Sequence, residues 1–158
     1  MSRKKMVDGL ITEFGKIIGI EELAMDDDNA CTLGFDDLQI SFQYAEDLDT
    51  MIVFSNLGRV TGEDKSELFQ DMLTANFYQE MMGGTVLCYN KESTSAVLIL
   101  HKKHFSGMNI AGFEEMLKNF TDLAESWTKR VRVSRDGGND SPSGLSEPSE
   151  IFDPTMKV

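Results

Sequence analysis

The sequence predicts an α+β protein with the element order α-β-β-β-α-β-β-α, in which helices pack on a twisted antiparallel sheet. Apolar residues recur at helical spacing in three separate segments, and strand-like segments with alternating apolar and polar residues lie between them. The connection at residues 90–92 is short enough for a β-hairpin. A chain of 158 residues with 41% apolar residues fits one domain with a buried core.

The first helix is predicted over Lys5–Ile18. Its apolar residues Met6, Leu10 and Phe14 recur at intervals of four, and Gly19 is suited to end the helix. Further apolar residues beside them widen the apolar stripe, so we expect one edge of this helix to stay exposed and to offer a partner groove.

Three strands are predicted next, as a meander. A short segment around Cys31 and Leu33 precedes a turn-prone stretch at 34–37, and Leu38–Tyr44 then alternates between apolar and polar residues. The segment Thr50–Leu57 is rich in β-forming residues and apolar on both faces, as is typical of a central strand.

The second half of the chain is predicted to form a helix, two strands and a long last helix. A helix is predicted after Thr61 and is expected to stop at Gly83-Gly84. Two strands follow at Thr85–Tyr89 and Ser93–Leu100. Apolar residues at alternating spacings of three and four then predict a long last helix over Ile110–Val131.

The formal net charge of -12 argues against a nucleic acid or an anionic lipid surface as the partner. The two cysteines are far apart in sequence and form no CxxC pair, so we expect a reducing cytoplasm rather than a disulfide scaffold. The start lacks the apolar core of a signal peptide, and the longest apolar run, 96–100, is too short to span a bilayer.

No motif points to catalysis. His101 and His104 stand three residues apart, but the neighbouring sequence offers no further metal ligands. The acidic run 26–29 lacks the glycine and glutamate of a calcium-binding loop, and the common phosphate, hydrolase and protease signatures are missing. We therefore expect no enzyme, no metal and no cofactor.

Several stretches carry a resemblance to a known family. An amphipathic first helix ends in a phenylalanine and a glycine, and a Leu-x-x-Asn helix end precedes a strand; these stretches are Leu10–Ile20, Met72–Tyr78, Gly83-Gly84, Val86–Tyr89 and Ser95–Leu100. Together with the long last helix, they make Lys5–Arg130 resemble the class I chaperones of bacterial type III secretion systems, most closely the Tir-chaperone branch.

The resemblance implies a cytoplasmic homodimer without catalysis. Such chaperones bind the N-terminal segment of a secreted effector in extended form, keep it secretion-competent and deliver it to the secretion ATPase. An open strand edge could add an effector strand, and the acidic surface favours basic or polar effector segments. The alternative is a regulatory protein on the same fold that sequesters a gene-expression factor.

The resemblance also suggests site residues, although a purely structural role in the core is the alternative for many of them. The effector-binding residues are expected to be Leu10, Phe14, Ile17, Leu38, Ile40, Phe42 and Phe54. The dimer interface is expected to involve Leu68, Met72, Leu73, Asn76 and Met82. On this assignment, Phe14→Asp should abolish effector binding and leave the dimer intact.

The composition changes near the C-terminus. All three prolines lie in the last 25 residues, together with several serines and glycines. This predicts a chaperone domain over 1–133 and a disordered acidic tail over 134–158. Within the tail, 150–154 is a small apolar island. It is either a docking motif, for another protein or for the chaperone's own groove, or part of an inert solubilising tail.

Overall fold

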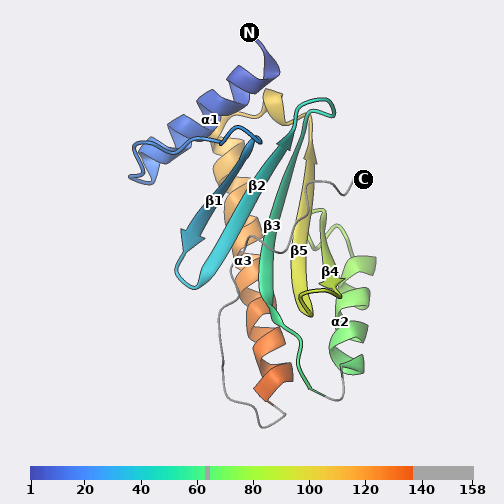
Figure 1. Ribbon diagram of the computed structural model, residues 1–158. Helices are drawn as coiled ribbons and strands as arrows, with labels where there is room; N and C mark the ends of the chain where they lie inside the picture. Colours follow the sequence, from blue (N-terminus) through green and yellow to red (C-terminus); the bar gives the residue numbers. More distant parts are fainter. Residues whose placement is uncertain (63–64, 137–158) are drawn as a thin grey trace.

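The computed structural model describes residues 1–62 and 65–136, which fold into an antiparallel sheet with helices against it (Figure 1). In chain order the elements are α1 (Arg3–Ile17), β1 (Ala30–Phe35), β2 (Leu38–Ala45), β3 (Thr50–Arg59), α2 (Ser66–Phe77), β4 (Thr85–Asn90), β5 (Ser95–Lys103), the 3-10 helix η1 (Phe105–Gly107) and α3 (Ile110–Asp136). The predicted α+β class and element order are confirmed. The predicted tail lies almost entirely outside the described residues.

The five strands are ordered β1-β2-β3-β5-β4, and each neighbouring pair is antiparallel. The first three strands form the predicted meander. The chain then leaves the sheet through α2 and returns as β4, which pairs only with β5 among the described strands. The sheet therefore has β1 at one edge and β4 at the other.

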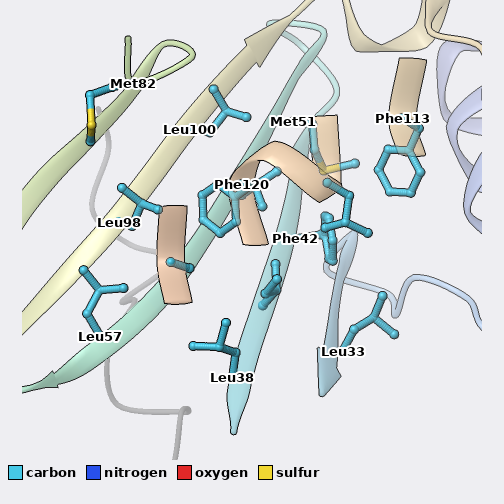
Figure 2. Packing of buried hydrophobic residues seen from close by; sticks show 14 of the residues in the cluster. Leu33, Leu38, Phe42, Met51, Leu57, Met82, Leu98, Leu100, Phe113 and Phe120 are labelled. Atoms are coloured by element: carbon cyan, nitrogen blue, oxygen red, sulfur yellow. The ribbon is translucent and has the colours of Figure 1, made fainter. Parts of the chain in front are cut away.

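One face of the sheet, the inner face, is covered by α1 and α3. In β2, the residues at every second position from Leu38 to Tyr44 are buried and belong to the core. On α3, the Phe113 ring meets Phe14 of α1 edge-to-face at 4.9 Å between ring centroids and lies 5.9 Å from Phe42 of β2. Figure 2 shows Phe113 and Phe120 among the strand side chains they pack against.

The opposite face of the sheet carries a different set of side chains. Directly paired strand residues share a face, so Thr32, Ser41, Phe54, Ile99 and Val86 form one row across all five strands. The row changes from polar on β1 and β2 to apolar on β3, β5 and β4. None of these five residues is part of the core cluster. We call this the outer face.

An irregularity in β3 requires a glycine. The β3–β5 register shifts between Asn56 and Gly58, and Gly58 adopts a φ of +119°. This backbone conformation favours glycine, whereas the space would admit a Cβ, which would lie in ordinary contact at 3.5 Å from Val131 of α3. The Gly58 N–H donates to Asn56 Oδ1 at 2.8 Å, which stabilises the bulge.

The second helix ends earlier than predicted. It stops at Phe77 rather than at Gly83-Gly84, and residues 78–84 form successive tight turns. Both glycines do adopt positive φ angles, so they reverse the chain into β4. Asn76, one residue before the helix end, is hydrogen-bonded through its side chain to β4.

A buried carboxylate in the β2–β3 turn joins the sheet to η1 and α1. Asp49, in the turn before β3, accepts hydrogen bonds from the Tyr44 hydroxyl (2.8 Å) and from the N–H and hydroxyl of Ser106 in η1 (both 2.9 Å). Arg3 Nε of α1 lies 3.9 Å from the same carboxylate. Burial alone would raise the pKa of Asp49, but these hydrogen bonds and the Arg3 charge outweigh burial and lower the pKa.

Asp49→Asn is expected to lower the free energy of unfolding at neutral pH by about 1–3 kcal/mol, because Tyr44 and Ser106 lose a charged acceptor. The pKa of Asp49 is lower in the folded state than in the unfolded state, so its stabilising contribution is complete above about pH 4 and is lost as the pH falls through the folded-state pKa. Urea unfolding followed by Trp127 fluorescence at several pH values measures this. A stability difference that stays constant into acid would contradict the role of the charge.

Candidate functional site

The described residues offer no obvious reactive centre. Within 1–62 and 65–136, no three His, Cys, Asp or Glu residues are grouped so that they could hold a metal ion. Burial raises the pKa of Cys31 to about 11, with a further contribution from the Asp26 charge, and burial also raises the pKa of Cys88. Both thiols are therefore poor nucleophiles near neutral pH. No helix in this part of the chain is both long and apolar enough to cross a membrane.

The first notable surface feature is a groove where α1, β1 and α3 meet, which we call the helix groove. It has a volume of about 370 Å³. Its lining residues come from all three elements: Phe14, Phe35, Glu114, Leu117, Lys118, Thr121 and Asp122. Ile17 lies one helical turn beyond Phe14 and is 53% exposed. The groove thus combines an apolar floor with a charged rim, in which Lys118 pairs with Asp122 at 2.9 Å.

The second feature is the edge of β1. The Ala30 N–H donates to Asp26 Oδ1 and the Ala30 carbonyl accepts from the Asp26 N–H, so both backbone groups of Ala30 point away from β2. Backbone groups alternate in direction along an antiparallel strand. The N–H and carbonyl groups of Thr32 and Gly34 therefore also point outward. No strand in the described part of the chain pairs with this edge.

The opposite edge of the sheet is closed by a side chain. Asn76 of α2 donates from Nδ2 to the Leu87 carbonyl at 2.9 Å and accepts from the Leu87 N–H at 2.8 Å. The side-chain amide offers one donor and one acceptor in the same way as a backbone peptide. It therefore takes the place that a neighbouring strand would occupy at the centre of β4.

The third feature is an exposed apolar surface at the end of α2 and in the turns after it. Leu73 is 69% exposed, Phe77 81%, Tyr78 54% and Met81 82%. The rings of Phe77 and Tyr78 meet edge-to-face with centroids 5.1 Å apart. Clustered exposure of four large apolar side chains is typical of a protein-binding surface. We call these four residues the α2 surface.

The expected effector-binding residues occupy three different environments. Five of them are almost fully buried in the core: Leu10, Phe14, Leu38, Ile40 and Phe42. Ile17 is exposed at the end of α1, and Phe54 is half-buried on the outer face. Of the buried five, only Phe14 also lines the helix groove. Because Phe14→Asp would place a charge in the core, it would test folding rather than effector binding.

The expected dimer residues are also divided. Leu68, Met72 and Met82 are buried within the protomer, where they pack in the core cluster. Asn76 is engaged with Leu87. Leu73 alone of this set is strongly exposed. It is therefore the one expected dimer residue whose side chain is free to contact a second protomer.

The expected site residues did not include the other residues of these surfaces. Phe77 stood in the apolar repeat of the predicted helix, where its spacing of four from Leu73 was the available signal. Tyr78 and Met81 fall after the true helix end, although Met81 continues the spacing of four from Leu73 and Phe77 in the sequence. Phe35 and Leu117 come from segments 82 residues apart, and only the fold brings them together in the helix groove.

Comparison with known families gives a match that covers most of the chain. The model of the Tir chaperone protein (CesT) family matches residues 9–128. This range includes the helix groove, both sheet edges and the α2 surface. None of the curated protein sequences is significantly similar to this chain.

Solved structures share the fold. A chain in the ExsC–ExsE complex has a TM-score of 0.73 at 19% identity, covering 83% of this chain and 97% of that one. A chain in the HopA1–SchA chaperone–effector complex has a TM-score of 0.67 at 11% identity, with coverages of 80% and 95%. A chain in the complex of the Yersinia pestis type III secretion chaperone SycH with a stable fragment of YscM2 has a TM-score of 0.60 at 18% identity, with coverages of 76% and 98%.

The edge role of Asn76 can be tested by Asn76→Ala. This variant should lose about 1–3 kcal/mol of unfolding free energy, because the Leu87 N–H and carbonyl lose their partners. The Leu87 amide should also exchange faster with solvent, which hydrogen-exchange NMR measures. Asn119→Ala, at an exposed position of α3, is the matched control and should change neither quantity. Unchanged exchange at Leu87 in Asn76→Ala would contradict the assignment.

Proposed function

Because the chain belongs to the Tir chaperone protein (CesT) family, we propose that it is a type III secretion chaperone. It binds the N-terminal segment of one or more effector proteins in extended form and keeps them soluble and secretion-competent. It then hands them to the secretion apparatus, through the secretion ATPase, in the bacterial cytoplasm. The single observation that carries this proposal is the family match over residues 9–128.

The geometry of the β1 side supports an extended client. The outward backbone groups of Thr32 and Gly34 can pair with one added strand. The helix groove lies beside this edge, since Phe35 at the end of β1 is part of its lining. A client segment can thus place its backbone on β1 and apolar side chains in the groove. Glu114 and Asp122 on the groove rim favour basic residues in the client.

The related structures support the same reading. HopA1–SchA is a chaperone–effector complex, and SycH is a type III secretion chaperone in complex with a fragment of YscM2. Those proteins bind polypeptide partners on a fold that this chain shares. We extend that mode of action to this chain on the strength of its family membership.

We further propose that the chain forms a homodimer through the α2 surface. This surface adjoins the β4 edge, and β4 lies at the opposite end of the sheet from β1 (Figure 1). Pairing through α2 would bury Leu73, Phe77 and Met81, which are each more than two-thirds exposed in the single chain. It would leave the β1 edge and the helix groove of both protomers accessible to a client.

The dimer proposal is tested by the double variant Leu73→Glu/Phe77→Glu. Its light-scattering mass should fall from about twice 17.7 kDa to 17.7 kDa, because four charges would face one another across the interface. Leu48→Glu, at a 70% exposed position in the β2–β3 turn, is the matched control and should remain dimeric. A wild-type protein that is monomeric at micromolar concentration would refute the dimer.

The chaperone function is tested by purifying the protein from its native host without denaturant and identifying what accompanies it. We expect the N-terminal part of a larger secreted protein. A gene-expression factor in its place would favour the regulatory alternative, and the absence of any specific partner would count against both. Ile17→Asp should reduce the recovered client, whereas Val133→Asp, at a 67% exposed position of α3, should not.

Strand addition at β1 makes a sharper prediction. Thr32→Pro removes an outward N–H and leaves the β1–β2 ladder intact, so it should lower client recovery by about fivefold or more. Thr32→Ala is the control, because both variants lose the hydroxyl contact with Ser41 but only proline loses the N–H. Equal recovery with the two variants would show that the client binds elsewhere.

A further inference from the structure

The outer face of the sheet carries an apolar area that neither proposed surface uses. Val86, Ile99 and Phe54 lie side by side on β4, β5 and β3. Ile52 extends this area along β3, where it is paired with His101 of β5. These four apolar residues are half-buried and lie outside the core cluster. They form a shallow platform rather than part of the interior.

A basic strand end borders the platform. His101 and Lys103 lie on the same face of β5 as Ile99, because successive side chains of a strand alternate between faces. Both are exposed, as are Lys102 and His104 beside them. This basic segment contrasts with the formal net charge of -12 of the chain. An acidic ligand with a small apolar element would be attracted here more than to most of the surface.

The C-terminal segment of the chain has this chemistry. Residues 137–158 contain four acidic residues and one lysine. Their only adjacent pair of large apolar residues is Ile151-Phe152, which stands between Glu150 and Asp153. The chain leaves the described part at Asp136, the end of α3. The 14 steps from there to Glu150 span up to about 46 Å when extended, compared with about 33 Å for the length of β3.

We propose that the segment Glu150–Asp153 docks on the outer face of its own chain. Ile151 and Phe152 would cover the platform formed by Ile52, Val86 and Ile99, and the flanking carboxylates would lie beside His101 and Lys103. This contact is separate from the β1 edge, the helix groove and the α2 surface, and it does not depend on the proposed chaperone function.

Photo-cross-linking in the full-length protein tests this docking. Phe152→p-benzoylphenylalanine should cross-link to peptides containing residues 52–54 or 97–101, as identified by mass spectrometry. The same photoreactive residue at Met156, also in the tail, is the positional control and should give a weaker cross-link there. Absence of a cross-link to β3 or β5, or one equally strong from Met156, would overturn the proposal. In a mixture of heavy and light protein, a product formed only between chains would also overturn it.

Charge reversal separates specific docking from general attraction. Lys103→Glu should reduce the cross-link yield by about two- to fivefold, in line with a surface ion pair, and adding Glu150→Lys should restore it. Lys102→Glu is the matched control, since its side chain points to the opposite face of β5. An equal loss of cross-link yield in both lysine variants would show an effect of net charge alone. It would refute the pairing of Glu150 with Lys103.

Discussion

The packing of one long helix against one face of the sheet is the constraint on which the rest of the structure depends. α3 spans 27 residues, and along its length it meets α1 through Phe113, the β3 bulge through Val131 and α2 through the Arg130–Asp71 ion pair. The Gly58 bulge lies beside Val131, near the C-terminal end of this helix. With the core placed on a single face, the sheet edges and the outer face are left to interact with other segments or chains.

The two edges of the sheet differ in a way that suits a binding protein. β1 presents outward backbone groups beside an apolar groove, whereas the centre of β4 is occupied by the Asn76 amide. The strand order places them four strands apart, about 19 Å in the hydrogen-bonding direction. A client at one edge and a second protomer near the other therefore need not compete for the same atoms.

The sequence was sufficient to predict the order of the elements but not the roles of individual surfaces. Alternation in β2 and the three-four spacing in α3 correctly indicated which side chains face the core, because these patterns follow from backbone geometry alone. Periodicity does not reveal what lies beyond a face, so Leu10 and Phe14 looked as suitable for a client as Ile17. The contact of Asn76 with Leu87, 11 residues away, is encoded by no local pattern.

The Asn76 contact also bears on how the protein behaves when many copies are crowded together. A sheet with two open edges carries both halves of a head-to-tail contact, so each added copy exposes a new edge for the next, and the assembly can grow into a fibre. With the Leu87 N–H and carbonyl already bonded to Asn76, the β4 half of that contact is blocked at its centre. A strand added at β1 is then the end of the sheet, and growth stops after one step.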